Sequence, residues 1–75
     1  MNDKVTAPLV QLHIDTLTLA REYRFQAHRI EKSVLGSPIT SSRHNYEIGR
    51  ARRLRVLARH LETVATDLAI IGEKQ

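Results

Sequence analysis

The sequence predicts an all-α fold, an antiparallel hairpin of two long helices that uses residues 1–75 as a single domain. Helix-breaking residues cluster at one place only, Gly36-Ser37-Pro38 followed by Thr40-Ser41-Ser42. On both sides of this cluster, apolar residues recur at spacings of three and four, which is the period of an α-helix. The chain has no Asn-Gly or Asp-Gly turn and no alternating β-branched pattern, so strands are not expected.

The first helix is predicted over residues 7–35. Thr6 is expected to cap its N-terminus, with Pro8 in the first turn, where a missing backbone N–H costs little. Gly36 is expected to close the helix in the left-handed conformation. The turn therefore covers residues 36–41.

The second helix is predicted over residues 42–71. Thr40, Ser41 or Ser42 can cap it, and Gly72 is the expected stop signal. Gly49 lies alone inside this helix and predicts a point of close approach. Each helix is about 30 residues long and so ~45 Å in length.

Apolar residues on the first helix cover a wide arc. One seam comprises Leu9, Leu12, Thr16, Ala20, Tyr23, Ala27, Ile30 and Val34. A second strip comprises Val10, Ile14, Leu17, Phe25 and His28. The second helix has one seam, formed by Leu54, Leu57, Leu61, Val64, Leu68 and Ile71 and widened by Ala58 and Ala65.

This arc is too wide for one partner helix to cover. We therefore expect a homodimer that forms a four-helix bundle, with the second strip as the dimer interface. A foreign helix in a hetero-complex and an isolated hairpin remain alternatives. Arg24 and Glu31 intrude near the apolar arc and are expected to reach across a helix interface, where they would set its register.

The positive charge is concentrated in the first half of the second helix. Residues 43–60 hold six arginines against the single acid Glu47, a local net charge of +5 in a chain whose formal charge is +4. Arg52, Arg55 and Arg59 are predicted to share the face opposite the leucine seam. Three interpretations stay open, namely a solvated face with pairs such as Arg43–Glu47 and Arg59–Glu62, a site for an acidic protein, and a nucleic-acid site.

Val56 and Ile70 are predicted to lie on the outer face of the second helix, on one line with Thr63 between them. Isolated apolar residues are common on protein surfaces. Beside the arginines, however, they would form an apolar surface with a cationic rim, which is typical of protein-binding sites. The predicted partner-binding residues are therefore Arg52, Arg55, Val56, Arg59 and Ile70.

No catalytic, cofactor-binding or metal-binding residues are predicted, and the chain is expected not to be an enzyme. It has no cysteine, and its histidines lack metal-ligand spacing, although His13 and His60 could approach each other. His13 is expected to be a hydrogen-bonded packing residue. No signal peptide and no apolar run of ~20 residues is visible, so we expect a cytoplasmic protein with no membrane partner.

Several families of small helical hairpins resemble this chain. The architecture resembles the Rop type of plasmid copy-number regulator, a hairpin that dimerises into a four-helix bundle and binds RNA. The segments Asn45-Tyr46-Glu47-Ile48, Leu57-Ala58 and Leu68-Ala69-Ile70-Ile71 are similar to the second helix of type III secretion needle-subunit co-chaperones. Small phage-encoded inhibitors of host regulators share the size and the charge. These resemblances imply a bacterial or phage protein and transfer no site residue.

The expected function is that of a non-enzymatic interaction module that binds a partner protein and inhibits, masks or holds it. Such a module would act as a small regulator, an anti-activator or a chaperone-like adaptor. The alternative is a nucleic-acid-binding regulator of the Rop type that uses the arginine-rich half of the second helix.

Overall fold

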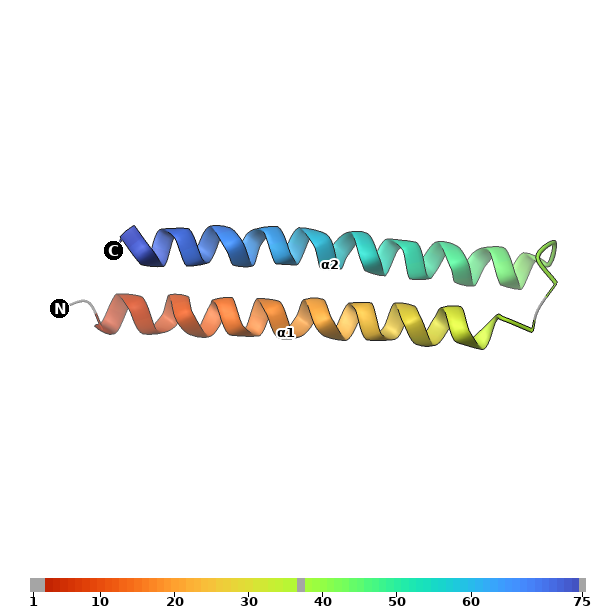
Figure 1. The fold of residues 1–75 in the computed structure, drawn as a ribbon, viewed down its shortest axis with the longest axis horizontal. Helices are drawn as coiled ribbons and strands as arrows, with labels where there is room; N and C mark the ends of the chain where they lie inside the picture. The colour runs from red at the N-terminus through yellow and green to blue at the C-terminus, as the bar shows by residue number, and fades with distance from the viewer. Residues whose placement is uncertain (1–2, 37, 75) are drawn as a thin grey trace.

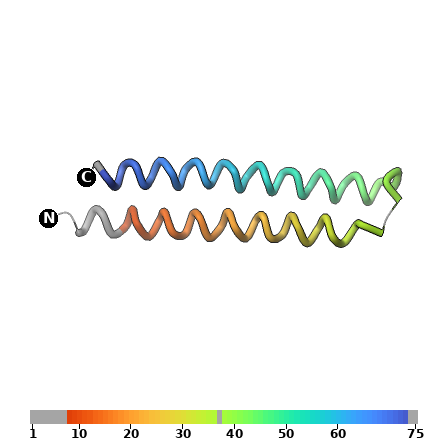
Figure 2. The backbone as a smooth tube through the Cα atoms, viewed as in Figure 1, coloured from red at the N-terminus to blue at the C-terminus, as the bar shows by residue number. Residues whose placement is uncertain are grey.

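The structure, a computed structural model, is a hairpin of two antiparallel helices, α1 (Asp3–Ser33) and α2 (Ser42–Lys74) (Figure 1). It describes residues 3–36 and 38–74, with side chains for 8–36 and 38–73. Figure 2 shows α1 and α2 side by side along their length, with the connecting loop at one end and both termini at the other. The molecule measures 59 × 14 × 11 Å. The predicted all-α hairpin is thus confirmed.

Small side chains that repeat every seven residues form the core. The buried hydrophobic residues are Ala20, Ala27, Val34, Ala51, Ala58 and Ala65. The Nδ1 atom of His13 lies 2.7 Å from the carbonyl oxygen of Ala65, which fixes the register of the two helices and confirms the expected hydrogen-bonded role of His13. Steps of seven residues toward the loop on both helices then bring Ala20 level with Ala58 and Ala27 level with Ala51. Alanine at each of these levels allows the helix axes to approach closely.

The larger apolar side chains lie beside this alanine seam instead of inside it. Val34 is the largest side chain that is fully buried among the described residues. Leu12, Leu57, Val64 and Ile71, which were predicted to form the hairpin seam, are about half exposed. The periodicity identified the correct helices, but the residues that close the hairpin are the alanines.

The ends of α1 differ from the prediction. The helix begins at Asp3, so Thr6 and Pro8 lie inside it, and Thr6 is not the residue that starts it. Its last turn tightens through bonds from the Val34 and Leu35 backbone N–H groups to the carbonyls three residues earlier, at 3.4 and 3.3 Å. These bonds satisfy the final carbonyls without a left-handed residue. Gly36 accordingly has no positive φ, and the expected left-handed closure is wrong.

The start of α2 follows one of the predicted alternatives. Ser41 Oγ accepts a 3.0 Å hydrogen bond from the His44 backbone N–H, so Ser41 is the N-cap. At the other end α2 continues through Gly72 to Lys74, and the predicted stop at Gly72 is wrong. A Cβ built on Gly49 would meet nothing within 4 Å, so Gly49 is not a point of close approach either.

Neither helix is apolar enough over a sufficient length to cross a membrane, within the residues that the structure describes.

The alanine seam can be tested with Ala58→Leu. Ala58 is fully buried between the helices, and a leucine there must push them apart or adopt a strained rotamer, which typically costs about 1–3 kcal/mol of unfolding free energy. Urea denaturation measures this loss. The matched control is Ala69→Leu, because Ala69 lines an open groove beside Leu9 and Leu68 and a leucine has room there. Equal losses in both variants would contradict the close-packed seam.

At Gly49, in contrast, a larger side chain is expected to increase stability. Replacing it with alanine should raise the free energy of unfolding by about 0.5–1 kcal/mol, because alanine loses less backbone entropy in a helix and its methyl group meets no neighbour. Thermal or urea denaturation followed by circular dichroism measures the gain. The control is Ala51→Gly in the same helix, which has the reverse propensity change and also removes a buried methyl group. A loss of stability in Gly49→Ala would show that a neighbour fills the space beside Gly49.

Candidate functional site

The outer face of α2 carries an apolar side chain surrounded by three arginines and a histidine. Val56 is 49% exposed. Residues three and four positions away are its neighbours on a helix surface, and here they are Arg52, Arg53, Arg59 and His60. All four are exposed. We call Val56 and these four residues the outer α2 patch.

The arginines of the outer α2 patch are available to a partner. Arg52, Arg53 and Arg59 form no ion pair with any residue that the structure describes. Arg52 and Arg53 also line a shallow, largely apolar groove together with Val56 and Leu57. An acidic group could therefore meet a guanidinium group while an adjacent apolar side chain contacts Val56.

Arg55, in contrast, is engaged within the hairpin. Its guanidinium group donates two hydrogen bonds to the Glu31 carboxylate, at 2.6 and 3.2 Å. Arg55 therefore differs from Arg52 and Arg59, which were predicted to share its face, because its guanidinium group already has a partner in the hairpin. The helical wheel placed Arg55 by angle alone, whereas the antiparallel register brings it next to Glu31 on α1.

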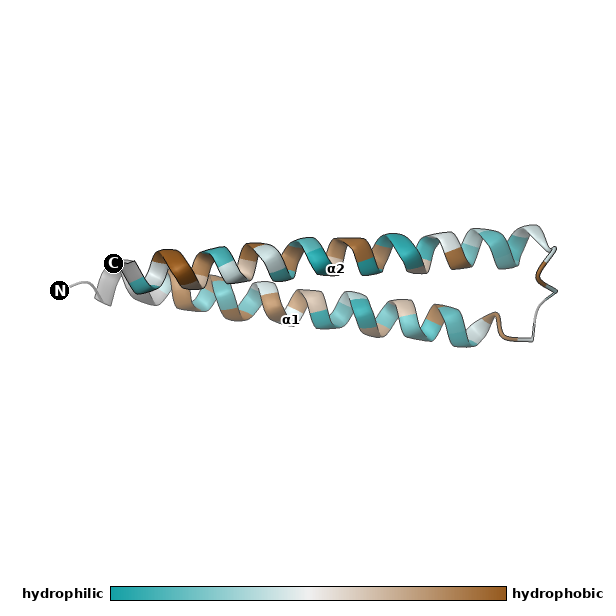
Figure 3. Cartoon of the chain, turned by 45° about the horizontal axis from the view of Figure 1, so that its top comes forward, coloured by the Kyte–Doolittle hydropathy of each residue, from teal (hydrophilic) through white to brown (hydrophobic). Residues whose placement is uncertain are grey.

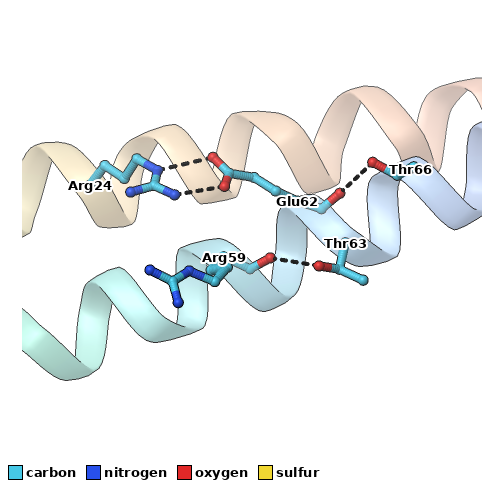
Figure 4. A network of polar contacts seen from close by, with 5 residues as sticks. All are labelled: Arg24, Arg59, Glu62, Thr63 and Thr66. Atoms are coloured by element: carbon cyan, nitrogen blue, oxygen red, sulfur yellow. Dashed lines mark hydrogen bonds and ion pairs between the residues drawn. The ribbon is translucent and has the colours of Figure 1, made fainter.

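A second pair of the same kind joins Arg24 and Glu62, with contacts of 2.6 and 2.9 Å (Figure 4). The expectation that Arg24 and Glu31 reach across a helix interface is confirmed. Hydrogen bonds from the arginines are the main cause that lowers the pKa of Glu31 and of Glu62 and raises the pKa of both arginines. The two pairs lie on one side of the alanine seam, which we call the ion-pair side.

The predicted pairs within the second helix form differently. Glu47 lies 3.4 Å from Arg50, one turn along α2, and not against Arg43. Glu62 pairs with Arg24 instead of Arg59, and Figure 4 shows the guanidinium group of Arg59 pointing away from that pair. Arg59 thereby stays free for the outer α2 patch.

Ile70 is 44% exposed but lies apart from the outer α2 patch. Fourteen residues separate it from Val56, which is ~21 Å along a helix. Its neighbours at helical spacing are Thr66, Asp67, Glu73 and Lys74, and none of them is an arginine. Of the predicted partner-binding residues, the structure thus groups Arg52, Val56 and Arg59.

Two members of the outer α2 patch, Arg53 and His60, were not among the predicted partner-binding residues. The signal that could have found them is their spacing from Val56, three and four residues. His60 is exposed, while His13 bonds to the backbone of α2. Among the described residues, no group of three potential metal ligands exists.

The residues of the predicted dimer strip lie on the ion-pair side of α1 and on its outer face. Val10, Ile14, Phe25 and His28 are exposed, and Leu17 is half-buried. The Arg29 guanidinium group lies over the Phe25 ring, 5.8 Å from its centroid. Arg24 and Glu31 interrupt the strip, and its role in dimerisation stays a prediction.

Comparison with known proteins identifies no relative: no family model matches the chain, and no curated protein or solved structure matches it either.

The ion pairs predict how stability depends on pH. Because the pKa values of Glu31 and Glu62 are below the ordinary 4.5 in the folded state, the pairs stabilise the hairpin above that pH. The contribution is lost as the pH falls through the lowered values. Urea midpoints measured at pH 7 and pH 3 should differ less in a Glu31→Gln, Glu62→Gln double variant than in the wild type. The control Asp67→Asn, on the outside of α2, should keep the wild-type difference between the two midpoints. An equally reduced difference in that control would contradict the conclusion that Glu31 and Glu62 cause the pH dependence.

Proposed function

We propose that this chain is a non-enzymatic interaction module that acts as a homodimer and holds an acidic segment of a partner protein against the outer α2 patch. By occupying that segment it would inhibit, mask or stabilise the partner. The exposure of Val56 within a ring of three arginines and a histidine carries this proposal.

The composition of the outer α2 patch supports a protein partner. Protein interfaces combine an apolar centre with a polar or charged rim, and arginine is enriched in them. Val56 provides the centre, while Arg52, Arg53 and Arg59 provide a rim of guanidinium groups that form no ion pair with described residues. Such a rim would accelerate the encounter with an acidic surface, and the apolar contact would slow dissociation.

A nucleic-acid ligand makes less use of the same patch. Phosphates would contact the arginines, but Val56 at the centre would face the charged backbone and gain nothing. The outer α2 patch has no aromatic side chain on which a base could stack. Arg55, committed to Glu31, also removes one cation from the predicted stripe.

The experiment compares Val56→Asp with Thr63→Asp. Both residues lie in the same outward row of α2, seven positions apart, and both changes add one carboxylate to an exposed site. The full-length wild-type chain is immobilised, incubated with nuclease-treated lysate of cells that express it, and the bound protein is identified and purified. Val56→Asp should weaken binding of that protein by about tenfold or more, because the anchor is lost and a charge is introduced into the interface. Thr63→Asp should change it by less than about threefold.

A second measurement separates the two classes of ligand. Fluorescence anisotropy follows binding of a 20-base-pair DNA duplex and a 20-base-pair RNA duplex over a salt series. Three phosphate contacts would give a slope of log K against log salt near −2.7. A slope of that size that disappears when Arg52, Arg53 and Arg59 become alanine would replace the proposal with a nucleic-acid-binding regulator. Protein binding that is insensitive to Val56→Asp would also overturn it.

A further inference from the structure

We infer that a second copy of this chain docks on the side of the hairpin opposite the ion pairs, with both loops at the same end of the resulting four-helix bundle. This inference rests on one part of the proposed function, namely that the chain forms a homodimer. It adds the face and the orientation of the dimer.

The spacing of a residue from a buried alanine determines on which side of the hairpin that residue lies. At Ala20, Ala27, Ala51 and Ala58, the residue four positions after the buried alanine forms an interhelical ion pair, and these residues are Arg24, Glu31, Arg55 and Glu62. After Ala65 the corresponding residue is Ala69, which carries no charge. The residue three positions after a buried alanine lies on the other side and is apolar. These residues are Tyr23, Ile30, Leu54, Leu61 and Leu68. The position just before each buried residue extends the same side outward, where Leu19, Leu57 and Val64 are 41–47% exposed.

We call this side the leucine face. Toward the open end of the hairpin it consists of Leu9, Leu12, Leu19, Tyr23, Leu54, Leu57, Leu61, Val64, Leu68 and Ile71. In Figure 3, hydrophobic brown is strongest near the C-terminal end of α2, whereas both helices are mostly teal and white near the loop. A groove lined by Gln26, Arg29, Ile30, Ser33 and Arg50 shows that the loop-proximal part of this same face is polar.

The exposed area supports docking on a partner of similar size. The hairpin exposes 5797 Å², whereas a compact folded protein of 8.6 kDa exposes ~4,700 Å². The excess of ~1,100 Å² exceeds the ~800 Å² that each partner buries in a standard stable interface. The leucine face spans both helices, so a single foreign helix would leave part of it uncovered. A second hairpin presents a surface of the same width.

The uneven polarity of the leucine face determines the orientation. If the two copies are related by a two-fold axis parallel to the helices, their open ends lie against each other. The loop-proximal parts of the two leucine faces then also lie against each other. Apolar residues then meet apolar residues, and Gln26, Ser33 and Arg50 meet polar residues near solvent. With the loops at opposite ends and full overlap, these polar groups would face Leu12 and Leu68 instead. Burying a polar group without a partner is unfavourable, and this arrangement would bury several such groups in each dimer.

The interaction between helix dipoles is equally favourable in the two arrangements. With the loops at the same end, α1 lies beside the antiparallel α2 of the second copy. With the loops at opposite ends, α1 lies beside the antiparallel α1 of the second copy. Neighbouring helices are antiparallel in both cases, so the matching of polar and apolar parts decides.

The leucine face is also favoured over the predicted strip on the other side. Val10, Ile14 and Leu17 are apolar, but Arg24 and Glu31 follow them along α1 within the ion-pair side. A dimer through that strip would cover ion pairs whose side chains are now 35–42% exposed to water. Desolvating them carries a penalty that the leucine face avoids.

The face is tested with a matched pair of valines. Val64 on the leucine face is 47% exposed, and Val10 on the ion-pair side is 51% exposed, both toward the open end. Light scattering and analytical ultracentrifugation over a concentration series give the dimer dissociation constant. Val64→Asp should raise it by about 100-fold or more, because each copy buries an unpaired carboxylate. Val10→Asp should change it by less than about threefold. Circular dichroism verifies that both variants keep their helices.

The orientation is tested without disturbing the interface. The chain has no cysteine, so Ile39→Cys at the loop, where the residue is 77% exposed, gives a single site for a nitroxide spin label. Pulsed electron paramagnetic resonance should find the two labels within about 30 Å, since adjacent helix axes in a bundle lie ~10 Å apart. Loops at opposite ends would instead separate the labels by nearly the 59 Å length of the hairpin. A label at Glu22→Cys, near the middle of α1, should give similar distances in either arrangement and serves as the control.

Each outcome bears on a different part of the inference. A wild-type monomer at all concentrations would overturn both the face and the dimeric part of the proposed function, while binding to the outer α2 patch would stand on its own test. Loss of the dimer in Val10→Asp but not in Val64→Asp would assign the interface to the predicted strip. A dimer with long distances between the labels at position 39 would overturn the orientation alone.

Discussion

The close contact of two helices through alanine determines the rest of this structure. Ala20, Ala27, Ala51, Ala58 and Ala65 repeat every seven residues, so the same small side chain meets the facing helix every second turn. Helices that approach this closely leave no room for leucine between them. The leucines are therefore displaced to the flanks of the seam, where the facing helix covers only part of each. A hairpin closed in this way has two defined sides but a small core, and its stability depends on what each side contacts.

The two sides meet this requirement differently. On the ion-pair side, Arg24–Glu62 and Glu31–Arg55 bridge the helices with paired hydrogen bonds, and each side chain keeps access to water. Pairs with such exposure add little to stability, but they oppose a shift of one helix along the other, since a shift of one residue would separate all four groups. On the leucine face none of the described side chains toward the open end is charged, so burial there requires another surface. The register and the unfilled apolar area thus have a common origin in the alanine repeat.

The sequence predicted the coarse architecture because long helices, a single breaker cluster and the Ser41 cap are local features. Local pattern did not determine where α1 ends, because its final carbonyls are satisfied by a tighter turn and not by Gly36. It also did not show that Arg55 is paired, because that depends on the residue that faces it across the hairpin. A helical wheel gives the angle of a side chain but not the identity of its neighbour on the other helix. For the same reason the wheel could not show that Leu57 and Val64 lie outside the seam.

The proposed dimer and the proposed partner site are compatible because they share only Leu57, which belongs to the leucine face and also lines the groove beside Val56. Val56 points away from the alanine seam, and the leucine face lies to one side of it, so docking a second copy leaves Arg52 and Arg59 accessible. With both loops at one end, the two outer α2 patches would stand at the same height on opposite sides of the bundle. A partner with two acidic segments joined by a linker long enough to pass around the bundle could then bind both patches at once. Its second contact would form at a high effective concentration, so a modest affinity at each patch would suffice for tight binding.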